Sequence, residues 1–384
     1  MKKIILVPDS FKGTMTSRQV CLIMEQVIRK YCPETEIISL PIADGGEGTV
    51  VAFLDVVEGE KRYVNVQGPF GEDIEAYYGV IDNGETAIIE MALCAGLNLV
   101  ETRLNPEATT TYGVGQIIKQ AITDGCKKLI IGIGGSCTND GGCGAASALG
   151  VEFYNEKGNK FIPTGGTLKD IRRIILENSL TALVDVEITV MCDVDNPLYG
   201  ENGAAYIYSP QKGADLKMVE NLDVGLRNLE QVVLSDLRID KSATPGSGAA
   251  GGLGYGLQVF CSAELKMGIE ILLDTIGFDD MLKDTDLVFS GEGKLDRQSL
   301  SGKAVIGVAR RCRKAKVPLI AVVGDIAEDI EEVYKQGVSA VYSTNRKAVA
   351  FEIAKTTAEA DLSLTMDEIM RSSLLPKKAT VICM

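Results

Sequence analysis

Histidine is absent from this chain of 384 residues, and so is tryptophan. Without histidine the chain cannot build a Ser-His-Asp or Cys-His catalytic group, nor a histidine-ligated metal site. The ten cysteines are scattered, and none belongs to a Cys-x-x-Cys pair. This pattern favours buried thiols over a disulfide framework or a zinc cluster. A reactive thiol at Cys137 or Cys143 is a weaker alternative, because no imidazole is available as its base.

Long apolar runs are absent as well, and none approaches the length of a membrane span. The N-terminal stretch MKKIILVPD is too short and too soon interrupted for a signal peptide, so we expect a cytoplasmic protein with no membrane partner. The formal net charge of −14 argues against an extended basic surface for nucleic acid. A local basic pocket for an anionic ligand is compatible with that charge.

Both ends of the chain alternate strands with helices. Residues 4–7 form a continuous apolar run that is typical of a buried parallel strand. Thr16 and Gln19 then suit a capping box for an amphipathic helix, and residues 36–40 resemble a second strand. Near the C-terminus the pattern predicts strands at 286–290, 318–323 and 339–343, and helices at 305–313, 328–336 and 348–371.

The middle of the chain differs, because hairpin-like pieces with turns at Gly68-Pro69, Asn83-Gly84 and Gly165-Gly166 join mixed strands and helices. We therefore expect an α/β protein with a Rossmann-like parallel three-layer α/β/α domain that is split in sequence. That domain would comprise residues 1–65 plus 285–384, with a second mixed α/β domain inserted at 66–284. Ligands of open α/β sheets bind beyond the carboxyl ends of the strands, so we expect the active site in the cleft between the domains.

Six segments combine glycine with acidic or other polar side chains, mostly just after an apolar run. One such segment is weak evidence, but their recurrence at the ends of elements favours functional sites over scattered turns. The segments are PDSFKGTMTS (8–17), ADGGEGT (43–49), GIGGSCTNDGG (132–142), CDVDNPLYG (192–200), PGSGAAGGLGYG (245–256) and SGEGKLDRQSLSGK (290–303).

Neither common nucleotide-binding signature is present. A G-x-G-x-x-G motif fails at residues 132–137 because Cys137 stands in place of the third glycine. A Walker A motif fails because Ala304 follows Gly302-Lys303. What remains are the general requirements of phosphoryl transfer, which are backbone N–H groups and lysines for phosphates, and carboxylates for a cation and for the acceptor hydroxyl.

Each residue taken singly also has a structural explanation. The alternatives are helix capping by Asp9, a solvated lysine at Lys12, an Asx-type turn at Asp193 and Asp195, turn stabilisation by Glu292 and Asp296, and close packing of the glycines at 246–256. Jointly, the six segments favour phosphoryl transfer.

In this order the six segments resemble the motifs of the class I glycerate kinases, of the bacterial glycerate 2-kinase type. The resemblance runs from about residue 3 to about residue 375. It implies Mg²⁺-assisted transfer of the γ-phosphate of ATP to a hydroxyl of D-glycerate, with 2-phosphoglycerate favoured over 3-phosphoglycerate, in glycerate or sugar-acid breakdown. It also implies two α/β domains, one inserted in the other.

Residue chemistry laid on these motifs gives the expected site. The catalytic candidates are Asp44, Asp193, Asp296 and Lys12. The substrate-binding candidates are Asp9, Ser10, Lys12, Glu47 and Ser299. The nucleotide- or phosphate-binding candidates are Gly134, Gly135, Ser136, Thr138, Asn139, Gly293, Lys294 and Lys303, and the metal ligands are Asp193, Glu292 and Asp296.

The loop at residues 134–142 would form a backbone cradle for an anion, and a helix beginning near Gly142 would add its partial positive charge. Asp140 would be a cap or a cation ligand.

Two other functions compete with glycerate phosphorylation. They are a kinase for another small hydroxy acid and a ligand-binding sensor that does no chemistry. A monomer and a homodimer both remain open.

Overall fold

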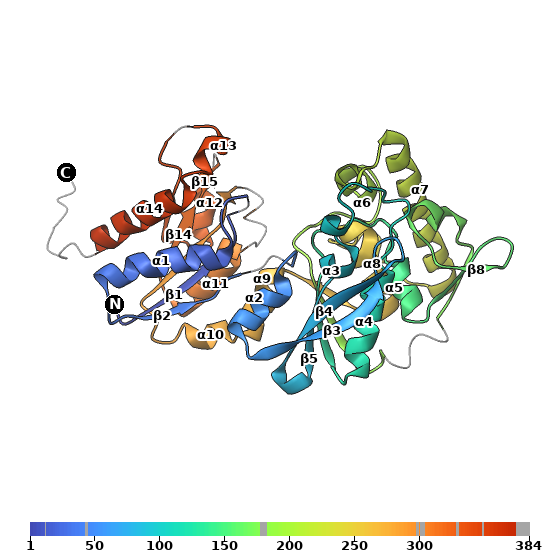
Figure 1. The fold of residues 1–384 in the computed structure, drawn as a ribbon, viewed down its shortest axis with the longest axis horizontal. Helices are drawn as coiled ribbons and strands as arrows, with labels where there is room; N and C mark the ends of the chain where they lie inside the picture. The colour runs from blue at the N-terminus through green and yellow to red at the C-terminus, as the bar shows by residue number, and fades with distance from the viewer. Residues whose placement is uncertain are drawn as a thin grey trace. The chain divides into compact units, whose positions relative to one another are not determined.

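The computed structural model describes residues 1–11, 13–42, 45–176, 183–296, 299, 304–327, 330–347 and 349–373. The chain divides into two compact units. Unit 1 comprises Met1–Ala43 and Ile269–Met384, and unit 2 comprises Asp44–Gly268. Both units combine β-sheets with helices, which confirms the expected α/β class (Figure 1).

Unit 1 holds a sheet of β1 (Lys3–Pro8), β2 (Glu36–Ser39), β12 (Leu287–Gly291), β14 (Leu319–Val323) and β16 (Ala340–Ser343). The five strands are parallel, in the order β16-β14-β12-β1-β2. Strand β1 connects the two sequence segments, because Ile5 lies opposite Ile38 on one side and Val288 on the other. This is the order of a doubly wound sheet, and its topological switch point lies between β1 and β12.

Helices cover both faces of this sheet. Helices α1 (Ser17–Tyr31) and α14 (Ala358–Ser373) lie side by side and enclose Ile4 and Leu6 in one core (Figure 1). Because side chains alternate along a strand, Ile5 faces the opposite side, where α11 (Ala304–Ala315) packs on β1 and β12. The expected three-layer α/β/α arrangement is confirmed. A fourth helix is α12 (Glu331–Lys335), and a small parallel pair is β13 (Lys294–Leu295) with β15 (Asp325–Ile326).

One expectation for unit 1 is wrong. The structure replaces the single helix expected at 348–371 by α13 (Phe351–Ala354) and α14, with a turn between them. The Thr356 hydroxyl donates to the carbonyl of Ile353 at 2.7 Å, and the Thr357 hydroxyl lies 3.3 Å from the carbonyl of Ala354 and 2.7 Å from Oδ2 of Asp361. Threonine side chains compete with helical backbone hydrogen bonds in this way, so the two adjacent threonines account for the interruption.

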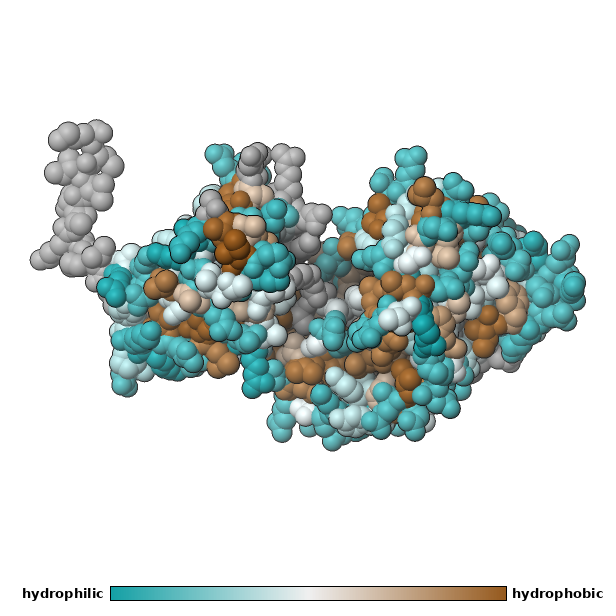
Figure 2. Space-filling model, turned by 45° about the horizontal axis from the view of Figure 1, so that its top comes forward, coloured by the Kyte–Doolittle hydropathy of each residue, from teal (hydrophilic) through white to brown (hydrophobic). Residues whose placement is uncertain are grey.

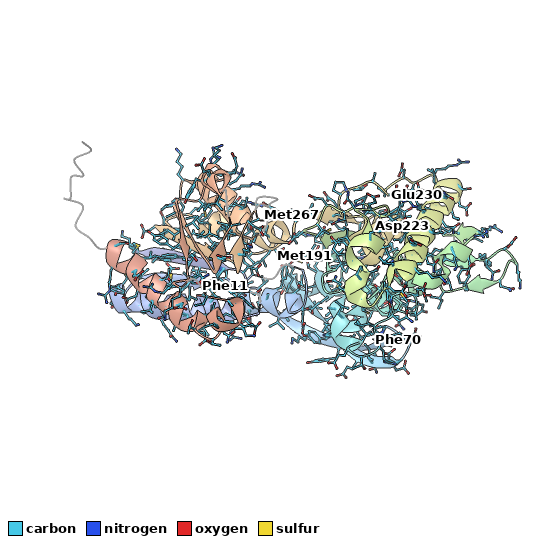
Figure 3. All side chains as sticks on the ribbon, turned by 90° about the horizontal axis from the view of Figure 1, so that it is seen from above. Phe11, Phe70, Met191, Asp223, Glu230 and Met267 are labelled. Atoms are coloured by element: carbon cyan, nitrogen blue, oxygen red, sulfur yellow. The ribbon has the colours of Figure 1, made fainter. Side chains whose placement is uncertain are left out.

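Unit 2 holds a mixed sheet of β3 (Gly59–Gln67), β4 (Asp73–Ile81), β5 (Thr86–Glu90), β6 (Lys128–Gly132), β10 (Glu187–Met191) and β11 (Glu264–Lys266). The order is β11-β10-β6-β5-β4-β3. Strands β3, β4 and β5 form antiparallel hairpins through Gly68-Pro69 and Asn83-Gly84, as expected. Strands β5, β6, β10 and β11 are parallel, so Glu90, Gly132 and Met191 end neighbouring strands at one carboxyl edge (Met191 is labelled in Figure 3).

A second sheet of unit 2 consists of β7 (Glu152–Tyr154), β8 (Lys160–Phe161) and β9 (Arg173–Ile175) in the order β8-β7-β9. Gly165 and Gly166 therefore do not form a hairpin turn, and they begin the 3₁₀ helix η3 (Gly165–Asp170) instead. The remaining helices are α2 (Thr49–Val56), α3 (Ala92–Ala95), α4 (Tyr112–Thr123), α5 (Cys143–Ala148), α6 (Ala204–Tyr208), α7 (Leu216–Leu237) and α8 (Ala249–Cys261), with 3₁₀ turns η1 (Asp82–Gly84), η2 (Leu97–Leu99) and η4 (Pro210–Lys212).

The division into units differs from the expected boundaries at 65/66 and 284/285. Helix α2 packs on β4 and β5, and β3 pairs along its whole length with β4, so both elements belong to unit 2. Helices α9 (Gly268–Thr275) and α10 (Phe278–Met281) contribute acidic residues that bind Arg311 of α11 in unit 1. The observed boundaries, at 43/44 and 268/269, therefore lie nearer the N-terminus than the expected ones.

The outer surface mixes polar and apolar residues. The face seen in Figure 2 shows separate brown areas among teal ones. Helix α7 carries Asp223 and Glu230 (both labelled in Figure 3), and other residues of this helix pack in the core of unit 2.

In the described part of the chain, no helix is both long and apolar enough to cross a membrane.

The capping box of α1 gives a first prediction. Thr16 Oγ1 accepts from the backbone N–H of Gln19 at 3.2 Å, and Gln19 Oε1 accepts from the N–H of Thr16 at 2.9 Å. Thr16→Ala removes the first of these bonds, so we expect the free energy of unfolding to fall by about 1 kcal/mol in urea titrations. Thr16→Ser keeps the acceptor and should stay near the wild type. Equal losses in both variants would contradict a capping role.

Candidate active site

The glycine-rich loop follows β6 at the carboxyl edge of the unit 2 sheet. The N–H of Gly134 donates to the carbonyl of Gly45 at 2.9 Å. A Cβ at Gly134 would lie 2.7 Å from Cα of Gly46, closer than real contacts allow. Glycine is therefore required here because the segment at Gly45 and Gly46 runs directly against the loop.

Helix α8 packs on the same loop from another side. A Cβ at Gly251 would lie 2.0 Å from the carbonyl oxygen of Thr138, and one at Gly256 would lie 2.5 Å from that of Gly141. The N–H of Gly141 also donates to the carbonyl of Gly251 at 3.0 Å. Close backbone packing, the structural alternative for the glycines at 246–256, is thus confirmed for these two.

Asp140 is buried, and its carboxylate accepts five hydrogen bonds. Its donors are the N–H of Thr111 at 2.7 Å, the hydroxyls of Thr111 at 2.9 Å and Thr110 at 3.4 Å, and the N–H groups of Gly142 at 3.1 Å and Gly144 at 3.2 Å. Burial raises the pKa of this carboxyl, while the donors hold it down. The cap position of α5 is Gly142, and the Asp140 carboxylate occupies that end of the helix by accepting from the N–H groups of Gly142 and Gly144.

Lys212 lies beneath the first half of the loop. Its side chain is buried, and Nζ donates to Oγ of Ser136 at 2.7 Å and to the carbonyl of Thr138 at 2.7 Å. Burial lowers the pKa of Lys212 to about 8, against the opposing influence of Cys137 and Asp140. At neutral pH the loop therefore rests on a buried ammonium group.

Two buried side chains of this loop lack hydrogen-bond partners. Thr138 Oγ1 and both polar atoms of the Asn139 amide have none in the part of the chain that the structure describes. Buried polar atoms are normally paired, so such a cluster marks a place for a polar ligand or an ordered water. Together with Lys212 and Ser136, these atoms have the chemistry that a phosphate or carboxylate group requires.

The two cysteines of this region are not nucleophiles. Burial raises the pKa of the Cys137 thiol to about 12, and it raises the pKa of Cys143 well above its usual value. Both remain protonated at neutral pH, which removes the alternative of an activated thiol.

Glu90, at the end of β5, holds the loop that carries Glu47. Its Oε1 accepts from the N–H of Gly48 at 3.1 Å, and its Oε2 accepts from the N–H of Val50 at 3.3 Å. Burial raises the pKa of Glu90. Glu47 itself is exposed at the start of α2, and Asp44 lies outside the described residues.

Asp193 follows β10 at the same carboxyl edge. Its Oδ1 accepts from the N–H of Gly268 at 2.8 Å, at the first residue of α9. The side chain is half-buried, whereas Asp195 two residues later is exposed. Unit 2 therefore brings together the loop at 134–139, the α2 loop with Glu47, and Asp193.

In unit 1, Asp9 and Glu292 follow the paired ends of β1 and β12 at the switch point. The N–H of Asp9 donates to the carbonyl of Gly291 at 2.8 Å, and Asp9 Oδ1 accepts from the N–H of Ser10 at 2.6 Å. Glu292 is buried. Thr16 is the cap of α1, so the alternative of a helix cap at Asp9 is wrong. Lys12 lies outside the described residues.

Asp296 and Ser299 form a local turn. The N–H of Asp296 donates to Oγ of Ser299 at 3.2 Å, and the N–H of Ser299 donates to Asp296 Oδ1 at 3.3 Å. The carbonyl of Gly293 accepts from the N–H of Asp325 at 3.1 Å, and Lys294 is exposed on β13. These bonds with Ser299 confirm the alternative that Asp296 stabilises a turn. Lys303 lies outside the described residues.

A metal site is not assembled among the residues that the structure describes, because no group of three or more cysteine and acidic side chains is placed for one. Of the expected ligands, Asp193 belongs to unit 2, while Glu292 and Asp296 belong to unit 1. Their assignment to Mg²⁺ stays a prediction. Thr138 and Asn139, in contrast, belong to the loop that Lys212 contacts, and their unpartnered hydroxyl and amide N–H groups are donors of the kind that an anion such as a nucleotide phosphate requires.

Comparison with known proteins identifies the family. The model of the glycerate kinase family matches residues 4–374. The glycerate kinase of Halalkalibacterium halodurans is 42% identical over 344 residues, which cover 89% of this chain and 90% of that protein. The glycerate 2-kinase of Escherichia coli is also 42% identical, over 342 residues that cover 89% of this chain and 90% of that protein. A crystal structure described as a glycerate kinase 2 from Salmonella typhimurium LT2 superposes with a TM-score of 0.84 at 37% identity, covering 97% of this chain and 98% of that one.

The fold and these relatives define an α/β phosphotransferase that uses an alcohol group as acceptor. The chain belongs to the glycerate kinase family, as its motifs predict.

Sequence reasoning missed two residues that position the site. Glu90 had a usable signal, because an acidic residue directly follows the buried apolar run Ile88-Ile89. Lys212 had none, since it stands in a polar stretch after Pro210 and nothing in its neighbours indicates burial.

The network around Asp140 gives a second prediction. Asp140→Asn replaces one acceptor oxygen by an amide group that cannot accept from the backbone N–H donors. We expect the free energy of unfolding to fall by about 1–3 kcal/mol in denaturant titrations, because buried donors lose their acceptor. Asp170→Asn, an exposed change in the same unit, should cost less than about 0.5 kcal/mol. Similar losses in the two variants would exclude a central role for Asp140.

Proposed function

We propose that the protein transfers the γ-phosphoryl group of ATP to a hydroxyl of D-glycerate, with Mg²⁺ accompanying the nucleotide. The observation that carries the proposal is the loop over Lys212, where a buried ammonium lies beside unpartnered polar atoms of Thr138 and Asn139. The names of the relatives support the acceptor, and the E. coli protein is named a 2-kinase. We therefore favour 2-phosphoglycerate as the product, formed in the breakdown of glycerate or sugar acids.

The reaction balances without a covalent intermediate on the protein. The substrate hydroxyl oxygen forms a bond to the γ-phosphorus, and the bond from that phosphorus to the β,γ-bridging oxygen breaks, which releases ADP. The hydroxyl proton passes to a carboxylate and then to solvent. Because the chain lacks histidine, a carboxylate is the proposed base.

The proposed roles follow the motifs. Asp44, Asp193 and Asp296 are the carboxylates nearest the chemistry, and Asp9, Ser10 and Lys12 lie on the substrate side. The Gly134–Asn139 loop, Lys294 and Lys303 hold anions. For Asp296 the observed turn with Ser299 supports a positioning role, whereas Asp193 is half-buried and follows β10 at the carboxyl edge where ligands of α/β sheets bind.

The deciding measurement is ADP release from Mg·ATP by the purified protein, with and without D-glycerate. We expect release to require both D-glycerate and Mg²⁺, and phosphorus NMR of the product should show the phosphate on the 2-oxygen. D-lactate carries only the 2-hydroxyl and 3-hydroxypropionate only the 3-hydroxyl, so the two acids test the position independently.

Three outcomes separate the alternatives. Turnover with another hydroxy acid but none with glycerate would keep the mechanism and replace the substrate. Product with the phosphate on the 3-oxygen would keep the substrate and refute the proposed position. Tight binding of an acid with no ADP release from any acid would support a sensor instead.

Asp193 gives a prediction of its own. Asp193→Asn should lower kcat about a hundredfold or more if this carboxylate orients or deprotonates the hydroxyl. The exposed neighbour Asp195, changed to Asn, is the matched control and should keep kcat within about twofold. If Asp193→Asn lowers the melting temperature but leaves kcat unchanged, Asp193 serves only to hold Gly268 at the start of α9.

A further inference from the structure

Lys212 contacts the loop through one side chain and one carbonyl group. Its Nζ lies 2.7 Å from Ser136 Oγ and 2.7 Å from the carbonyl oxygen of Thr138. In the residues that the structure describes, no carboxylate forms an ion pair with it. The ammonium is therefore held by neutral acceptors, and its charge is not cancelled by direct contact with an anion.

This contact excludes one direction for the O–H of Ser136. An ammonium group only donates, so Ser136 Oγ must accept from Lys212 and its own O–H must point elsewhere. That hydroxyl has no acceptor among the described residues. The next residue towards the N-terminus is Gly135, which is exposed and adopts a φ of +73°. Ser136 itself is buried, so its free O–H is a buried donor directly beside an exposed residue of the loop.

We infer that Lys212 is a positioning residue that keeps the Ser136 hydroxyl available as a donor for an oxyanion of the substrates. The oxyanion is a phosphate of the nucleotide or the carboxylate of the acid. A hydrogen bond from a charged donor polarises the hydroxyl that accepts it and strengthens the bond which that hydroxyl makes in turn. Lys212 thus conveys the influence of its positive charge to the ligand through Ser136, without touching the ligand.

This inference rests on the proposed function and adds a residue to it. A merely structural lysine would also hold the loop, but its loss would affect stability without depending on Ser136. For a lysine that orients the hydroxyl, the effect on ligand binding depends on Ser136 and is absent once that hydroxyl is removed.

The test measures dissociation constants of Mg·ADP and of D-glycerate separately by titration calorimetry, with ADP release as an independent assay. We expect Lys212→Met and Ser136→Ala each to weaken binding of the same one of these two ligands by about tenfold or more. The double variant should be weakened little beyond Lys212→Met alone. Lys217→Met, an exposed lysine five residues further on, should bind like the wild type. Weaker binding of Mg·ADP would identify the oxyanion as a phosphate, and weaker binding of D-glycerate would identify it as the carboxylate.

A pH series separates orientation from stability. The titratable side chains that influence Lys212 are Cys137 and Asp140, and the pKa of the Cys137 thiol, about 12, lies above the window. Since the pKa of Lys212 is about 8, wild-type binding should weaken as the pH rises through that value and the ammonium loses its proton. Ser136→Ala keeps Lys212 but removes the hydroxyl, so it should lose this pH dependence.

The outcomes are distinct. Four results would overturn the inference. The effects of the two substitutions could be additive in the double variant, or the pH dependence could persist in Ser136→Ala. Lys212→Met could bind both ligands like the wild type, or the wild type could bind neither ligand. If Lys212→Met does not fold, Ser136→Ala and its pH series decide alone. Coupled binding effects without ADP release would refute the proposed function and leave the inference standing.

Discussion

The geometry of the candidate site depends on one buried carboxylate. Asp140 joins the loop after β6 to the Thr110-Thr111 segment and to the first turn of α5 through five hydrogen bonds. A buried charge is costly unless donors replace the lost water, and here the backbone and two hydroxyls replace it. Because those donors come from two segments of the chain, at residues 110–111 and 142–144, the loop cannot change shape without exposing an unpaired carboxylate.

Close approach of backbones reinforces this constraint. The segment at Gly45 and Gly46 lies against Gly134, and α8 lies against Thr138 through Gly251. Any Cβ at Gly134 or Gly251 would collide with main-chain atoms, which cannot move aside as a flexible side chain can. The loop is therefore clamped from two sides before a ligand arrives, which is the preorganisation that phosphoryl transfer requires of its binding groups.

The limits of prediction from sequence follow from the same physics. The strands of unit 1 were predictable because parallel strands buried on both faces appear as continuous apolar runs, and Thr16 with Gln19 marked the start of α1. The glycines were harder, since backbone approach and phosphate approach both require a missing Cβ and leave the same residue in the sequence. Lys212 could not be predicted at all, because its burial depends on acceptors 74 and 76 residues away.

The absence of histidine gives Lys212 an additional significance. No other side chain has an unperturbed pKa between 5 and 8, so a histidine-free chain must shift another group to change its charge near neutrality. Burial moves the pKa of Lys212 to about 8 without pairing it with a carboxylate. Placing the lysine under the loop, rather than on it, keeps the ammonium away from solvent and so lowers its pKa. In the proposed arrangement the Ser136 hydroxyl passes the effect of that charge to the ligand, and the effect changes near pH 8, where a solvated lysine with an ordinary pKa would stay charged.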